Sequence, residues 1–326
     1  MGENAIVVEG LAKRFGRVVA LDGIDFEVPA GTVLGLLGPN GAGKTTAIRI
    51  LSTVLTPDAG KAEVLGFDVV GRANEVRYRI GLAGQFAAVD PNLTGRENLK
   101  LIGRLVHLAP PLIAPRAAEL LERFGLSDAA DRPVRTYSGG MRRRLDLAAA
   151  LVQRPSVLFF DEPTTGLDPQ SRSELWNMTR ELVADGTTVL LTTQYLEEAD
   201  RLAQQIAVID KGKVIANDTP AALKAHLGST VIELGMGEEA AALRAQTLLS
   251  NLNGHTPERE GELVRLKTDR GPRLLMEALR ALDGEGLVPA TLAVREPSLD
   301  DVFLALTGHH AEDEEPPADK PRKAGA

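Results

Sequence analysis

Hydrophobic residues occur along the chain in short continuous runs that alternate with segments of helical spacing. The runs lie at Thr32–Leu37, 157–161, 187–192 and 205–210, and we expect each to form a strand. Thr32–Leu37 is continuously apolar, which is typical of a strand buried on both faces of a sheet. Between them, 44–55, 170–184 and 196–203 carry apolar residues three and four positions apart, as amphipathic helices do. This alternation predicts an α/β fold, in which helices pack on a parallel sheet.

The regions on either side of the first run differ from it in pattern. Ala5–Glu9, Val18–Leu21 and Ile24–Val28 are rich in β-branched residues and are separated by glycines, so we expect three short strands. Residues 90–155 are leucine-rich at helical spacing. They predict a helical subdomain with helices at 97–108, 113–124 and 139–152.

A second unit begins near Ser229. Strands are expected at 230–234, 262–268 and 290–294, and helices at 238–252 and 272–282, which fits a small βαββαβ module. A last helix, 299–307, has Ser298 as its N-cap. The predicted organisation is therefore a domain at 1–227, an α+β module at 228–308 and a disordered acidic tail at 309–326.

Composition excludes several classes of protein. No apolar run approaches the roughly 18 residues of a membrane helix, and the first residues lack the pattern of a secretory signal. The absence of cysteine excludes disulfides and thiolate metal sites. A formal charge of −8 argues against a nucleic-acid-binding protein. These features indicate a soluble, acidic protein of the cytoplasm.

A glycine-rich loop follows the first buried run. Gly38–Thr45 matches Gly-x4-Gly-Lys-[Ser/Thr], whose backbone N–H groups surround nucleotide phosphates at the start of a helix. Lys44 is placed for the β- and γ-phosphates and Thr45 for Mg²⁺. The residues expected to contact the nucleotide are Gly38, Pro39, Asn40, Gly41, Ala42, Gly43, Lys44, Thr45 and Thr46. The alternative, an ordinary glycine turn, fits poorly between a buried strand and a helix.

Two carboxylates end the second run. Asp161 and Glu162 lie at the carboxyl end of a strand, where α/β sheets bind ligands. Asp161 would assist Mg²⁺ and Glu162 would polarise the attacking water. The alternative is an acidic strand end that faces solvent.

Ser138, Gly139 and Gly140 form a second glycine-rich turn before a helix, between the loop and the carboxylates. Alone, this turn could be a serine N-cap with permissive glycines. In this order, however, the three motifs resemble the ATPase subunits of ABC transporters. The resemblance covers about residues 4–227 and implies a P-loop ABC ATPase domain that binds ATP and Mg²⁺.

The resemblance implies further roles. In the family, the turn at 138–140 contacts the nucleotide of a second subunit, so the active site is complete only in a dimer. Gln85 occupies the place of a glutamine that senses Mg²⁺, although a lone glutamine before a helix is usually a surface residue. Phe15 matches the aromatic that stacks on adenine, although an aromatic in a strand is more often core. The basic run Arg142–Arg144 on the following helix fits a solvated face better than a phosphate contact.

Gln194 stands where nearly all of the family has a histidine that contacts the γ-phosphate. With its surroundings, Thr192–Asp200, and with Glu296–Gly308, it resembles the daunorubicin/doxorubicin-resistance ATP-binding proteins. These are separate ATPase subunits that act beneath a membrane permease. The resemblance implies a homodimer on the cytoplasmic side of the membrane that drives efflux of a hydrophobic drug- or lipid-like compound. The alternatives are a non-transport ABC ATPase acting on the ribosome or DNA, and a binding module that uses ATP only as a switch.

Overall fold

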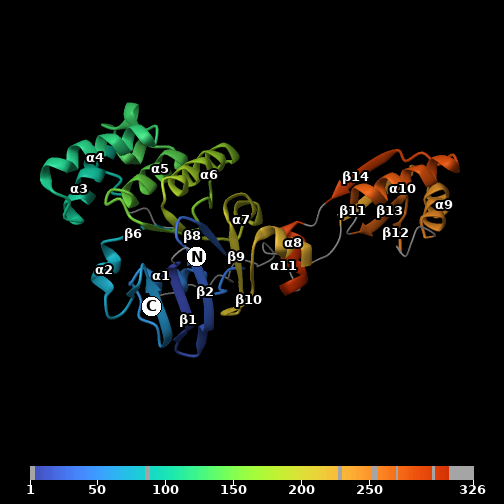
Figure 1. The fold of residues 1–326 in the computed structure, drawn as a ribbon. Helices are drawn as coiled ribbons and strands as arrows, with labels where there is room; N and C mark the ends of the chain where they lie inside the picture. The colour runs from blue at the N-terminus through green and yellow to red at the C-terminus, as the bar shows by residue number, and fades with distance from the viewer. Residues whose placement is uncertain are drawn as a thin grey trace, which may run out of the picture. The chain divides into compact units, whose positions relative to one another are not determined.

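The computed structural model describes residues 4–84, 89–226, 230–250, 256–268, 271–295 and 298–307 (Figure 1). Residues up to Pro220 form one compact unit and residues from Ala221 form another. This division lies seven residues before the boundary expected from the sequence. Gln85 and the tail at 309–326 lie outside the described residues. Among the described helices, none is both long enough and apolar enough to cross a membrane.

A six-stranded sheet forms the centre of the first unit. Its strand order is β10-β9-β3-β8-β7-β6. The strands are β3 (Val33–Leu37), β6 (Ile80–Ala83), β7 (Val157–Asp161), β8 (Thr188–Thr193), β9 (Gln205–Asp210) and β10 (Lys213–Asp218). All pairs are parallel except β9–β10. Every residue of β3 is buried, as its continuous apolar run predicts, and every residue of β7 and β8 is buried as well. The expected parallel core is confirmed.

A second, antiparallel sheet has the order β2-β1-β4-β5. It contains β1 (Asn4–Phe15), β2 (Val18–Pro29), β4 (Ala59–Val64) and β5 (Phe67–Asp68). The expectation of separate strands at 18–21 and 24–28 is wrong, because both belong to β2. Ile24 pairs with Leu11 and Asp22 with Ala12, so Gly23 is an extra residue at a bulge, where its φ of +74° favours glycine.

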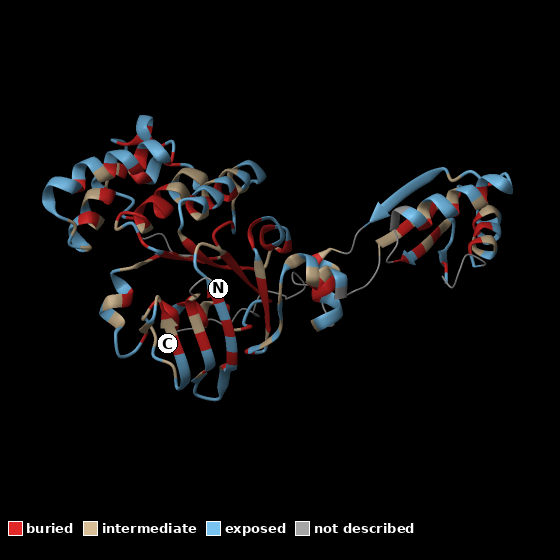
Figure 2. Ribbon diagram, viewed as in Figure 1, coloured by how far each residue is buried: buried red, intermediate tan, exposed pale blue. Residues whose placement is uncertain are grey.

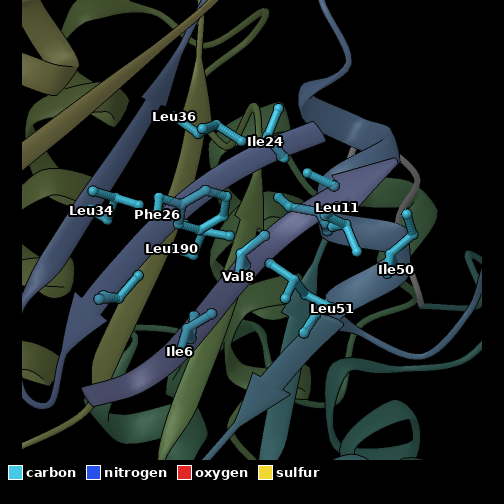
Figure 3. Packing of buried hydrophobic residues seen from close by; sticks show 14 of the residues in the cluster. Ile6, Val8, Leu11, Ile24, Phe26, Leu34, Leu36, Ile50, Leu51 and Leu190 are labelled. Carbon is cyan, nitrogen blue, oxygen red and sulfur yellow. The ribbon is translucent and has the colours of Figure 1, made fainter. Parts of the chain in front are cut away.

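The core of this unit joins the two sheets and the first helix. Ile6, Val8 and Phe26 of the antiparallel sheet lie against Leu36 and Leu190 of the parallel sheet (Figure 3). The helix α1 (Lys44–Leu51) closes this core. Since the loop that precedes α1 leaves β3 directly, core packing fixes the position of the loop.

The helical subdomain contains α3 (Gly95–Leu105), α4 (Pro110–Arg123) and α5 (Gly139–Ala150). Thr94 and Glu97 form a reciprocal capping box at the start of α3. The helix ends earlier than expected because His107 takes a φ of +57°, which no α-helix continues. The other helices of the first unit are α2 (Ala73–Arg77), α6 (Pro169–Ala184) and α7 (Leu196–Leu202). The helix α8 (Pro220–His226) begins at the boundary between the two units.

The second unit contains a four-stranded antiparallel sheet of order β12-β13-β11-β14. Its elements are β11 (Thr230–Gly235), α9 (Glu239–Leu249), β12 (Glu258–Glu260), β13 (Leu263–Thr268), α10 (Gly271–Gly284) and β14 (Thr291–Arg295). This is the expected βαββαβ order. Alternate residues of β11 and β13 are buried against the helices (Figure 2). The final helix, α11 (Leu299–Thr307), begins at Ser298, whose hydroxyl accepts a hydrogen bond from the N–H of Asp301.

Candidate nucleotide-binding site

The predicted motifs converge because parallel strands end at the same edge of the sheet. Leu37 of β3 pairs with Thr193 of β8, and Asp161 of β7 pairs with Thr192. The glycine-rich loop, the two carboxylates and Gln194 therefore follow three adjacent strands. Sequence positions more than 100 residues apart meet at this edge.

Glycines are required at both ends of the loop. At Gly38, a Cβ atom would collide with the carbonyl oxygen of Ile209. Gly43 has a φ of +112°, which side chains rarely adopt, and a Cβ there would meet the Ala20 carbonyl. The loop can therefore pass close to β9 and β2 before it enters α1.

Lys44 is buried at the start of α1, with only 4% of its surface exposed. Its Nζ donates to the carbonyl oxygens of Gly38, at 2.6 Å, and Pro39, at 2.9 Å. Nζ also lies 3.9 Å from Oε1 of Glu162. The ammonium is thus oriented by its own loop and faces the carboxylate expected to act in hydrolysis.

Thr45 and Asp161 form an oxygen-rich corner beside the lysine. The Thr45 hydroxyl donates to Asp161 Oδ1 at 3.1 Å, and the Thr192 hydroxyl donates to the same oxygen at 2.7 Å. Hydroxyl and carboxylate oxygens are the donors that Mg²⁺ takes in nucleotide sites. Thr45 and Asp161 therefore fit the predicted metal. Thr192 is a site residue that the motifs did not predict.

Glu162 has a φ of +50°, a conformation uncommon for a residue with a side chain. Its N–H donates to both the carbonyl and the hydroxyl oxygen of Thr192, each at 3.1 Å. At the other end, the Thr165 hydroxyl donates to Glu162 Oε2 at 3.5 Å. Backbone strain of this kind persists where surrounding bonds determine it, often at functional sites.

Gln194 is half-buried directly after β8. The next residue, Tyr195, donates its N–H to the Thr193 hydroxyl, and its ring lies 4.8 Å from the guanidinium of Arg172. Among the described residues, none forms a hydrogen bond with the Gln194 side chain. The structure therefore places Gln194 at the correct edge of the sheet, and its γ-phosphate contact stays a prediction.

Ser138 caps α5 by accepting a hydrogen bond from the Met141 N–H at 3.2 Å. Ser138 and Gly139 are exposed, whereas Gly140 is half-buried against Ser171. Within the described part of the chain, no hydrogen bond joins this turn to Lys44 or Thr45. In the described ranges, the turn therefore forms no hydrogen bond with these two residues of its own chain's phosphate-binding loop. Its expected contact with the nucleotide of a second subunit stays a prediction.

Phe15 ends β1 with 49% of its surface exposed, so it is not a core residue. The preceding residues are fixed by Asp58, which accepts from Lys13 Nζ and from the Arg14 N–H, both at 2.7 Å. These bonds lower the pKa of Asp58. An exposed ring on a fixed strand end suits base stacking, which stays a prediction.

Comparison with known proteins agrees with this geometry. Residues 21–165 match the ABC transporter family model. The chain is 54% identical to the daunorubicin resistance ATP-binding protein DrrA2 of Streptomyces coeruleorubidus, over 97% of this chain and 98% of the relative. It is 44% identical to the Nod factor export ATP-binding protein I of Ralstonia nicotianae, over 94% of each chain.

Solved structures show the same fold. A nucleotide-free ATP-binding cassette from an ABC transporter matches with a TM-score of 0.63 and 27% identity, over 69% of this chain and 95% of that one. The cbiO1 protein of Clostridium perfringens matches with a TM-score of 0.64 and 26% identity, over 69% and 92%. By its motifs, fold and near full-length identity, the chain belongs to the ATP-binding proteins of ABC transporters, in the group of the daunorubicin and doxorubicin resistance ATP-binding proteins.

Proposed function

We propose that this chain is the ATPase subunit of an ABC exporter, working as a homodimer beneath a separate membrane permease. The observation that carries the proposal is the convergence of Lys44, Glu162, Thr45 and Asp161 at one sheet edge. It brings an ammonium within 3.9 Å of a carboxylate and a hydroxyl within 3.1 Å of another. Phosphoryl transfer to water requires a cation near the phosphates, oxygen ligands for a metal ion and a base for the attacking water. This sheet edge brings the three together.

Each residue of the site has a separate role in binding or hydrolysis. The loop at 38–46 binds the phosphates through its N–H groups, and Lys44 neutralises charge on the β- and γ-phosphates. Thr45 and Asp161, with Gln85, would hold Mg²⁺, which would supply further charge neutralisation. Glu162 accepts the proton of the attacking water. Phe15 stacks on adenine, and Gln194 donates an N–H to the γ-phosphate.

The turn Ser138–Gly140 binds the nucleotide held by the second copy. The exposure of Ser138 and Gly139 in one chain supports this assignment. Closing on ATP and opening after hydrolysis would drive the permease. The names of relatives in daunorubicin resistance and Nod factor export support a hydrophobic, drug- or lipid-like cargo. The subunit itself would lie on the cytoplasmic side of the cell membrane. Within the described ranges of the chain, no feature favours the ribosome- or DNA-directed alternative.

The function is tested with purified protein and the Lys44→Ala variant. Wild type should hydrolyse ATP and lose this activity when Mg²⁺ is chelated. The variant should be slower by about 10³-fold, because it lacks a charge-assisted contact in the transition state. Hydrolysis by Lys44→Ala near the wild-type rate would exclude the assigned site. Export is tested in cells that contain a candidate permease, by daunorubicin accumulation with and without an active subunit.

A further inference from the structure

Arg143 has contacts that a solvated helix face does not explain. It lies on α5, five residues after Ser138, and its side chain is only 13% exposed. Its Nε donates to the carbonyl oxygen of Pro163 at 2.7 Å, and its Nη1 donates to that of Gly84 at 2.5 Å. The expectation that the basic run Arg142–Arg144 is a solvated face is wrong for this residue.

The two carbonyls belong to segments that leave adjacent strands. Gly84 follows β6 and Pro163 follows Glu162 after β7, and these two strands pair in parallel. One guanidinium on α5 therefore connects the ends of both strands. The planar guanidinium suits this task because its N–H groups point in fixed directions.

The buried charge is compensated locally. Asp146, one turn further along α5, places its Oδ2 3.6 Å from Nη1 and is only 4% exposed. Burial lowers the pKa of Arg143, while Asp146, Glu198 and Asp161 oppose that shift. A buried ion pair is weak evidence for stability in itself. We therefore attribute a positional role to this pair, on the basis of the two carbonyls that Arg143 connects.

The hydrogen bond from Arg143 to the Pro163 carbonyl helps to fix the position of the neighbouring Glu162. Proline already fixes its own φ, so a fixed carbonyl also determines how the chain continues into Thr164 and Thr165. Thr165 in turn donates to Glu162 Oε2. A pocket of about 360 Å³ is lined by Gly139 and Arg143 of α5 and by Glu162 and Thr165 of the loop after β7. Arg143 thus links the helix that carries the Ser138–Gly140 turn to the loop that carries the base.

We propose that Arg143 is a positioning residue that couples the two ATP sites of the dimer. This inference rests on the proposed function, in which one chain supplies Glu162 to its own nucleotide and Ser138–Gly140 to that of its partner. When the turn binds the partner's nucleotide, a shift of α5 moves Arg143. Arg143 then moves the loop that contains Glu162, because it is hydrogen-bonded to Pro163. Each site then reports its occupancy to the other through this side chain.

The test uses the full-length Arg143→Gln variant in steady-state ATP hydrolysis and in equilibrium binding of a fluorescent ATP analogue. We expect kcat to fall about 10- to 100-fold, as for a small displacement of a catalytic group. The Kd for the analogue should change less than about threefold, since the loop at 38–46 is untouched. The Hill coefficient of hydrolysis, about 2 when two sites are coupled, should approach 1.

Arg116 offers a matched control. It is 11% exposed, and its guanidinium also bridges two backbone carbonyls, those of Leu151 and Val152. Arg116→Gln should lower thermal stability to a similar extent while kcat and the Hill coefficient stay at wild-type values. If Arg143→Gln does not fold, Arg143→Lys takes its place. This variant keeps the charge without the planar guanidinium and should show the same changes, reduced in size.

Three results would overturn the proposal. They are a wild-type kcat and Hill coefficient in the folded Arg143 variant, an equal loss of kcat in Arg116→Gln, and a loss of analogue binding that parallels the loss of kcat. Wild-type protein that neither binds nor hydrolyses ATP would instead refute the proposed function, whatever Arg143 does.

Discussion

The two units of this chain differ in what they bury. The first places charged and hydroxyl groups in its interior, among them Lys44, Asp161 and Glu198. In the described residues of the second, Thr268 is the single buried polar side chain, and the other buried side chains are apolar. Burying polar groups costs free energy unless partners satisfy them. For Lys44 and Asp161 the nucleotide-binding site explains this cost, whereas the core of the second unit contains almost no such groups.

The largest expected effect comes from Glu162→Gln. The amide keeps the size of the side chain and can still accept from Thr165, but it cannot take a proton from water. Turnover should fall about 10²- to 10⁴-fold, the usual contribution of a general base. ATP binding should remain, and the ATP-bound dimer should accumulate, as measured by light scattering with Mg-ATP. Normal turnover in this variant would remove Glu162 from the mechanism and would leave its backbone strain without a function.

Substitutions of Gln194 test whether this residue, which replaces the histidine of the wider family, contributes to ATP hydrolysis. An amide can donate to a phosphate oxygen but cannot titrate near neutral pH. Gln194→Ala should lower kcat by about tenfold, less than the roughly 10²- to 10³-fold cost of a principal donor. Gln194→Glu should be slower still, because it adds a negative charge near the phosphates.

The histidine variant completes this series. Gln194→His should stay active, and its rate should depend on pH between about 6 and 7, where histidine titrates. Wild type should lack this dependence. Equal kcat values for wild type, the alanine variant and the glutamate variant would mean that Gln194 is only a polar strand-end residue.

Glu198 tests the cost of burying polar groups directly. It is fully buried, with Trp176 Nε1 donating to its Oε1 at 3.1 Å. Burial raises the pKa of Glu198, so its neutral form is favoured by folding. The resulting stability is complete below the unfolded pKa of about 4.5 and is lost as the pH rises through the higher folded value.

Glu198→Gln cannot titrate and keeps an acceptor for Trp176. Its Tm should therefore exceed that of wild type by an amount that grows as the pH is raised from 5 to 8. The neighbouring Glu197 is 63% exposed and pairs with Arg201 on the surface, so Glu197→Gln is the control. It should show a Tm difference that is small and nearly constant with pH. A constant difference for Glu198→Gln as well would show that Glu198 is charged in the folded protein throughout this range.

The sequence predicted the parts of the fold that depend on local pattern. Apolar runs identified β3, β7, β8 and β9 because the buried strands of this sheet consist mainly of apolar residues. The bulge at Gly23 was missed, since a glycine inside one strand and a glycine between two strands have the same sequence signature. The charged strand β12 gave no hydrophobic signal at all.

The candidate site likewise contains residues that a local sequence pattern predicts and residues that it does not. Lys44, Asp161 and Glu162 belong to contiguous motifs, whose residue types already imply their chemistry. Thr192 and Arg143 do not. Thr192 meets Asp161 through the register of β7 with β8, and Arg143 meets Pro163 through the packing of α5 on the sheet. Such contacts depend on tertiary structure and leave no local pattern in the sequence.

The smallest expected effect on nucleotide chemistry comes from deleting residues 229–326, and it tests the comparison of the two units most directly. Every described polar group of the site precedes Pro220, and the core around Leu34 and Leu190 contains no residue of the second unit. The truncated chain should therefore bind a fluorescent ATP analogue with a Kd within about threefold of wild type. Export should fall, because the removed segment resembles an element of drug-export subunits. A large loss of ATP affinity would show that the second unit supports the nucleotide site. Wild-type ATP affinity and wild-type export by the truncated chain would show that the second unit is needed for neither nucleotide binding nor export.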